Sequence, residues 1–165
     1  MLAVHRGRTA LVAVLGVAIL AGTGEALGRG EDRSWEVGAY AFNSSFDNSS
    51  NLDDALGFGV RAAYYIRALH ALEIQVDQAT ADHISLPGVE IDVLKYSLNY
   101  LRNFQLKRTE KMAPFFLLGW GLLDADDGTG SDDSMVIRVG GGSRSFLTPH
   151  FALRIEGAMY HWNGD

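Results

Sequence analysis

The sequence predicts an all-β fold, an antiparallel up-and-down transmembrane β-barrel of the eight-stranded type. Seven segments between residues 35 and 162 alternate apolar residues with polar or small ones at a period of two, which is the period at which strand side chains change faces. A basic start and one apolar run precede them, as in exported proteins. Glycine is abundant, with 19 residues, and no amphipathic helical pattern is present, so strands dominate.

The first 26 residues predict a cleaved secretory signal peptide. His5, Arg6 and Arg8 precede residues 10–21, which are apolar except for Gly16, and small residues flank a cleavage point after Ala26. The apolar run is shorter than the roughly 20 residues of a transmembrane helix. We therefore expect a signal peptide at 1–26, a short N-terminal lead at 27–34 and the barrel domain at 35–165.

Composition excludes several classes of protein. The chain has a formal net charge of −6 at pH 7 and no cysteine, which excludes disulfides, thiolate metal sites and a lipid-anchored N-terminal cysteine. Removal of residues 1–26 makes the remainder more acidic, because two arginines are lost with only one glutamate. An acidic exported protein is a poor candidate for nucleic-acid binding, and we expect none.

The seven predicted strands cover residues 35–42, 56–66, 72–81, 91–104, 114–123, 135–146 and 151–162. Most are close to the length that a tilted strand needs to cross a bilayer, about 9 to 11 residues. Outer-membrane barrels keep longer loops outside and shorter turns in the periplasm. With a periplasmic start, the outward connections carry Asp47, Asp53, Asp54, Asp82, Glu90, Asp124, Asp126, Asp127, Asp132 and Asp133, and the others carry Arg67, Lys107, Arg108 and Lys111 against Glu110.

Sorting each strand by parity separates two chemically different faces. One face is free of charge, and we expect it to meet lipid: it holds Trp35, Phe58, Leu98, Leu118 and Trp120 among others. The opposite face holds many glycines together with nine charged residues: Glu36, Arg61, Glu73, Asp77, Lys95, Arg138, Arg144, Arg154 and Glu156.

The charged face predicts a filled lumen. Buried charges cost several kcal/mol each unless they are paired, so we expect a network of ion pairs. About eight strands enclose a bore that side chains can fill, which argues against a wide pore. A soluble periplasmic barrel of the lipocalin type is the alternative, because alternation alone does not say which face is inside. Such a barrel needs an apolar interior for its ligand.

Three segments carry a resemblance to a known family: WEVGAY at 35–40, NLDDALGFGVRA at 51–62, and GGGSRSFLTP at 140–149 followed by ALR at 152–154. They resemble the outer-membrane β-barrel family typified by the transmembrane domain of outer-membrane protein A. The resemblance implies an eight-stranded barrel in a bacterial outer membrane, with structural, adhesive or receptor-like loops. It implies no catalytic residues and no cofactor. The expected partners are outer-membrane lipid, lipopolysaccharide and the barrel assembly machinery.

The strand count departs from this family. Single-chain bacterial barrels have an even number of strands, and seven strands leave unpaired backbone at two edges, which lipid does not tolerate. We expect either that the chain is incomplete at its C-terminal side or that a strand-donating partner chain closes the sheet.

Two weaker site hypotheses stay open at this point. The acidic segment with Asp124, Asp126, Asp127, Asp132 and Asp133 has ligands suited to Ca²⁺ or Mg²⁺, but not the spacing of the twelve-residue calcium loop. His83, Ser85 and the nearby Glu90 resemble the His, Ser and activating Glu of the lipid A deacylase family of outer-membrane hydrolases. Leu86 replaces the Asn that follows the Ser in that family. We expect neither a metal site nor an enzyme.

Overall fold

The computed structural model describes residues 8–21, 34–46, 54–67, 69–82, 90–104, 112–126, 131–148 and 151–162. All regular structure in these ranges is strand. The strands are β1 (Arg8–Ala21), β2 (Trp35–Phe46), β3 (Ala55–Arg67), β4 (His70–Asp82), β5 (Glu90–Asn103), β6 (Met112–Asp126), β7 (Ser131–Phe146) and β8 (Phe151–Trp162). Within the described ranges, no helix is long and apolar enough to span a membrane.

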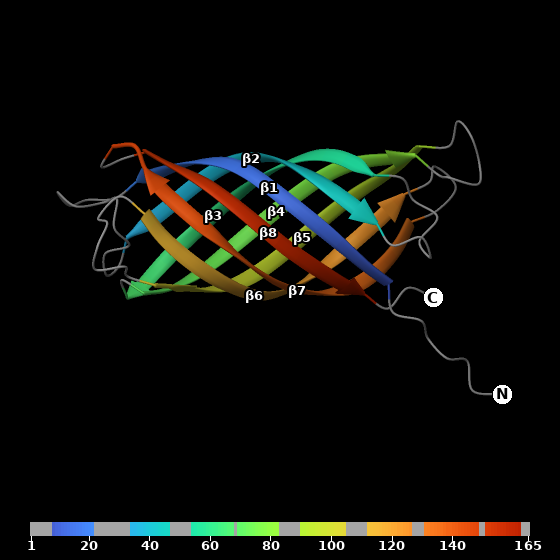
Figure 1. Cartoon of the computed structure of the whole chain (residues 1–165). Helices are drawn as coiled ribbons and strands as arrows, with labels where there is room; N and C mark the ends of the chain where they lie inside the picture. The colour runs from blue at the N-terminus through green and yellow to red at the C-terminus, as the bar shows by residue number, and fades with distance from the viewer. Residues whose placement is uncertain are drawn as a thin grey trace.

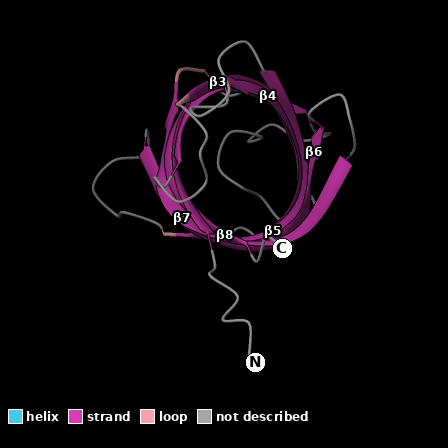
Figure 2. Ribbon diagram, turned by 90° about the vertical axis from the view of Figure 1, so that its right-hand side faces the viewer, coloured by secondary structure: helices cyan, strands magenta, loops and turns pink. Residues whose placement is uncertain are grey.

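The strands form a closed antiparallel barrel in which each strand pairs with its neighbours in sequence and β1 pairs with β8. Figure 1 shows the strands tilted against the barrel axis, and the view along the axis in Figure 2 shows the closed ring. We call the end with the β2–β3, β4–β5 and β6–β7 connections the loop end. The opposite end, with the β1–β2, β3–β4, β5–β6 and β7–β8 connections, is the turn end.

The predicted fold class is confirmed, and the seven predicted strands are found as β2–β8. Three of them continue further into the loop end than alternation indicated. β2 extends through Phe46, where Ser44 pairs with Ala55, and β6 and β7 extend until Asp126 pairs with Ser131. Polar residues at a rim keep the backbone ladder because water can solvate their side chains there. The expected long connections at 43–55 and 124–134 are therefore shorter.

β1 corrects the expectation of an open barrel. The segment Arg8–Ala21, predicted as part of a signal peptide, lies between β2 and β8, with twelve register pairs to each. Its Val, Ile, Leu and Ala residues satisfy the apolar run of a signal peptide and the composition of a strand equally well. In the chain as it stands, closure therefore needs neither a further C-terminal strand nor a partner chain.

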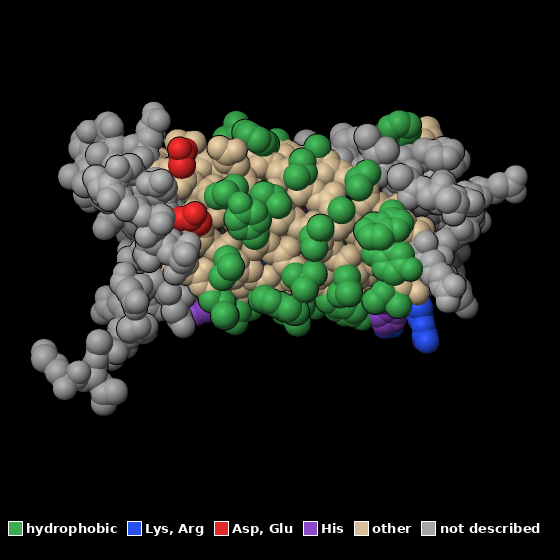
Figure 3. Space-filling view, turned by 180° about the vertical axis from the view of Figure 1, so that it is seen from behind, with side chains coloured by type: hydrophobic (Ala, Val, Ile, Leu, Met, Phe, Trp, Pro, Cys, Tyr) green, Lys and Arg blue, Asp and Glu red, His purple; other side chains and the backbone are tan. Residues whose placement is uncertain are grey.

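The two faces lie as the parity sorting predicted. The residues assigned to lipid are exposed or half-buried on the outer wall, for example Leu56, Phe58 and Trp120 at 75%, 65% and 59%. Apolar side chains cover much of the barrel wall in Figure 3. The nine charged residues are all buried. The inward residues therefore form the core of this fold, and the apolar residues form its outer surface.

Candidate functional site in the lumen

Arg154 on β8 is the centre of the interior. Its guanidinium Nη1 lies 2.6 Å from Glu73 Oε2 on β4 and 3.9 Å from Glu36 Oε1 on β2. It also donates through Nε to Glu156 Oε2 at 2.9 Å. Arginine presents five donors in a rigid planar arrangement, which suits contact with several carboxylates at once. One side chain thus connects three strands across the barrel.

A second arginine extends this centre toward the loop end. Arg138 on β7 donates to Glu156 and to the amide oxygen of Gln75. Asn99 donates to Glu73 and to Gln75 at 3.3 Å each. Arg61 on β3 lies 3.7 Å from Glu156 Oε2, with its guanidinium 4.9 Å from the centre of the Tyr40 ring. Glu156 therefore contacts three arginines, Arg61, Arg138 and Arg154.

The turn end of the lumen has its own cluster. Arg144 Nε lies 3.3 Å from Glu36 Oε2, and its Nη1 donates to Asn103 Oδ1 at 2.6 Å. Tyr65 donates its hydroxyl to Glu36 Oε2 at 2.5 Å. The guanidinium of Arg144 lies 4.8 Å from the centre of the Phe115 ring. Glu36 joins this cluster to the centre through Arg154.

Asp77 organises the loop end of the lumen. Its carboxylate lies 2.6 Å from Lys95 Nζ and accepts hydrogen bonds from the Tyr40 hydroxyl and from Gln75 Nε2. Lys95 also lies 3.7 Å from the centre of the Tyr160 ring. A Cβ at Gly59 would come within 2.5 Å of Tyr40 and Asp77. Glycine at this position therefore provides the space for the Tyr40–Asp77 contact, as expected for glycines on this face.

These connected groups lie along the lumen from the turn end to the loop end. All nine predicted interior charges lie there, and each is within ion-pair distance of an opposite charge. Pairing is the condition under which burial of charge is tolerated. Three interior aromatic residues, Tyr40, Phe115 and Tyr160, are not among the predicted lumen residues. Tyr40 and Tyr160 share the parity of the charged residues on their strands, and Phe115 shares that of Gly119 and Gly121 on β6, so parity identifies all three.

The charged interior removes the soluble-barrel alternative, which requires an apolar cavity. The other candidate sites are only partly described. Asp124 is half-buried in β6 and pairs in register with Asp133 of β7, Asp126 and Asp132 lie in the same ladder, and Asp127 lies outside the described residues. The described ranges contain no cluster of three or more potential metal ligands. His83 and Ser85 lie outside the described residues, and Glu90 is the first residue of β5.

Comparison with known proteins agrees with this geometry. A family model described as the outer membrane protein beta-barrel domain matches residues 9–164. The match therefore includes β1 as well as β2–β8. No curated protein matches the chain.

Proposed function

Given that this chain belongs to the outer membrane protein β-barrel domain family, we propose that it is a closed barrel with a structural or surface-interaction role. The outer membrane is its location, and the barrel is its membrane-spanning part. The lumen does not serve as a wide pore. The proposal includes no enzymatic activity and no cofactor.

The network centred on Arg154 carries this proposal. Arg154 contacts carboxylates on β2, β4 and β8. Arg138 extends the network toward the loop end, and Arg144 extends it toward the turn end. Opening a path for solutes would separate these buried ion pairs, and loss of one partner from a buried pair costs about 3–5 kcal/mol. The interior is therefore suited to holding the barrel rigid, and interactions with the surroundings fall to its ends.

We propose the orientation of the barrel from its charges. We place the loop end at the cell surface and the turn end in the periplasm, because the described acidic side chains outside the lumen gather at the loop end, where divalent cations can bridge them to lipopolysaccharide. Acidic residues at the loop end, among them Asp54, Asp92 and Asp124, then face the lipopolysaccharide layer. Divalent cations between these carboxylates and lipopolysaccharide phosphates would support such contact.

Export through residues 1–26 is part of the same proposal, and delivery to the membrane then depends on the barrel assembly machinery. The apolar run that would direct export is also β1. If the signal peptide is cleaved after Ala26, the position between β2 and β8 becomes free, and a strand-donating chain would have to fill it. The N-terminal residue of protein extracted from outer membranes tests this step directly: residue 27 supports cleavage, and a residue before Arg8 contradicts it.

Permeability tests the closed lumen. The full chain is reconstituted in liposomes, and swelling is followed after addition of small sugars. We expect no swelling above that of protein-free liposomes, whereas a diffusion porin in parallel liposomes should give rapid swelling. Swelling at the porin rate would contradict a filled lumen. Carbonate washing of membranes provides a separate check, because an integral barrel stays in the pellet.

A further inference from the structure

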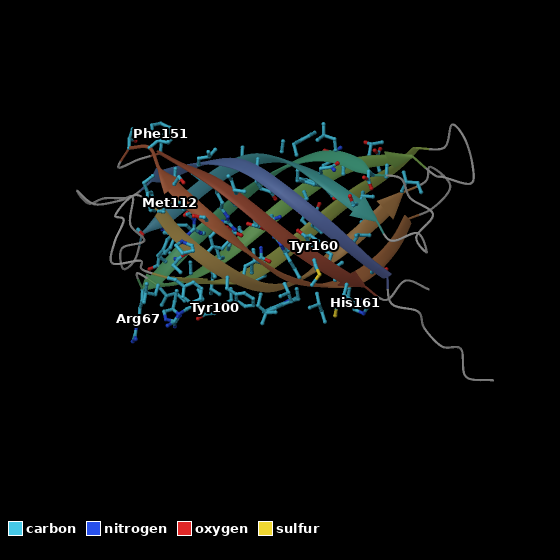
Figure 4. The ribbon with its side chains drawn as sticks, in the orientation of Figure 1. Arg67, Tyr100, Met112, Phe151, Tyr160 and His161 are labelled. Carbon is cyan, nitrogen blue, oxygen red and sulfur yellow. The ribbon has the colours of Figure 1, made fainter. Side chains whose placement is uncertain are left out.

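Three basic side chains lie side by side on the outer wall at the turn end. A register shift after Tyr65 places Arg67 opposite His70, and His70 pairs in turn with Arg102. Arg67 and Arg102 are exposed and His70 is half-buried. Figure 4 shows Arg67 near Tyr100 at this end, and Figure 3 shows Arg and His side chains together at the edge of the apolar belt. We call Arg67, His70, Tyr100 and Arg102 the basic cluster.

A chain of hydrogen bonds orders this cluster. Arg102 Nη1 lies 2.7 Å from His70 Nε2, and His70 Nδ1 contacts the Tyr100 hydroxyl. A guanidinium only donates, so His70 Nε2 is the acceptor, and the donor nitrogen of the ring is Nδ1. Nδ1 then donates to the Tyr100 oxygen, which leaves the hydroxyl hydrogen of Tyr100 available. The cluster therefore presents hydrogen-bond donors outward.

The donors have no acceptor of opposite charge in the part of the chain that the structure describes. No described carboxylate lies within ion-pair distance of Arg67 or Arg102. The exposed donors are two planar guanidinium groups and one phenol. Arginine in this arrangement suits the tetrahedral oxygens of phosphate, which accept several donors together.

The position of the basic cluster on the wall indicates how deep in the membrane a bound ligand would lie. The Trp35 and Tyr64 rings at the same end of the wall lie tilted against each other with their centres 4.9 Å apart, and the His70 and Tyr100 ring centres lie 5.9 Å apart. Phe116 on β6 is the register partner of Arg102 and is exposed. Aromatic residues of this kind mark the boundary between hydrocarbon and headgroups in barrels. The guanidinium groups are therefore at the level of lipid phosphates.

We propose that the basic cluster binds the phosphodiester headgroup of a glycerophospholipid in the periplasmic leaflet. Arg67 and Arg102 contact the phosphate oxygens, Tyr100 donates to a phosphate or ester oxygen, and His70 positions Arg102 and Tyr100. The described acids Asp54, Asp92 and Asp124 lie at the opposite end, so an anionic headgroup is favoured at the turn end. The leaflet assignment rests on the orientation in the proposed function.

Native mass spectrometry of the full chain in detergent micelles tests the site, with phosphatidylglycerol as the probe. We expect the folded protein to retain one bound lipid. Arg67→Gln together with Arg102→Gln should lower the apparent affinity about tenfold or more, because each basic side chain near a membrane surface contributes about 1 kcal/mol. His161→Gln is the matched control, since His161 is exposed at the loop end, and it should leave retention unchanged. Mobility of unheated protein in SDS gels shows that all variants are folded.

Equal retention by the wild type and the folded double variant would overturn the proposal. Displacement of the lipid by an equal concentration of inorganic phosphate would overturn it as well, since the ligand would then be the free ion. Stronger retention of lipid A than of phosphatidylglycerol would overturn the leaflet assignment. Sugar permeability is a separate measurement, so a failure of the closed-lumen proposal is distinguished from a failure of this one.

Discussion

Removal of β1 is the most informative perturbation of this barrel. The variant consists of residues 27–165, which keeps β2–β8 and every charged residue of the lumen. Its matched control consists of residues 8–165, which keeps β1 and removes only the seven residues before it. We expect the control to fold like the full chain. Residues 27–165, with no other chain present to donate a strand, should fail to form a stable barrel in detergent or lipid.

The expected magnitude follows from the register. β1 forms twelve pairs with β2 and twelve with β8. In an antiparallel ladder, alternate residues turn both N–H and C=O toward a given neighbour, so removal leaves roughly a dozen unpaired groups on each exposed edge. Each such group facing lipid costs several kcal/mol. The total exceeds the whole stability of an ordinary domain, about 5–15 kcal/mol.

Unheated SDS-gel mobility measures the result, supported by protease resistance of the folded band. The full chain and residues 8–165 should give a compact band that shifts on heating, and residues 27–165 should not. A synthetic peptide of residues 8–21 added during refolding should restore part of the compact band. A compact, protease-resistant band from residues 27–165 alone would refute the reasoning, because seven strands would then close without β1.

Three further predictions concern the interior, the wall and the glycines. Arg154→Ala should destabilise the barrel by about 3–5 kcal/mol, because it leaves buried carboxylates unpaired; urea unfolding in detergent measures this, and an added Glu73→Gln should recover part of the loss. Leu118→Arg should cost about 2–4 kcal/mol if the site is near the bilayer midplane, and unchanged assembly would show that the faces are reversed. Gly142→Ala should lower the unfolding midpoint, because its Cβ would collide with the Ile155 carbonyl, whereas Gly157→Ala should be neutral, with nothing within 4 Å of the added Cβ.

Alternation predicted which residues face inward, but not which of them pair. Glu73 and Arg154 share the inward parity of their strands, so the sequence assigns both to the lumen. Their contact joins residues 81 positions apart on strands that are not neighbours. The tilt and stagger of the strands in the closed barrel decide such contacts, and no local sequence pattern predicts them.

The ends of the strands were harder to predict, for physical reasons. At a rim, the side chains meet water on both faces, so the period of two loses its apolar signal. Ser44 and Asp124 were therefore assigned to loops although both lie in ladders. Arg67 was assigned to a turn for the same reason, and its register position beside His70 depends on a local shift in the ladder. β1 was missed because an apolar run without polar alternation is equally compatible with a signal peptide.

Closure through β1 brings Arg8 opposite Trp162 in the ladder, so the first and last strands start and finish at the same end of the barrel. A ring of antiparallel strands has no first member once these two ends are joined. A circular permutant that links the region after Trp162 to the region before Arg8, and opens the chain at the turn between Phe146 and Phe151, would have the same order of neighbours. Such a permutant should retain the ion-pair network, because every contact in it depends on position around the ring and not on order along the chain.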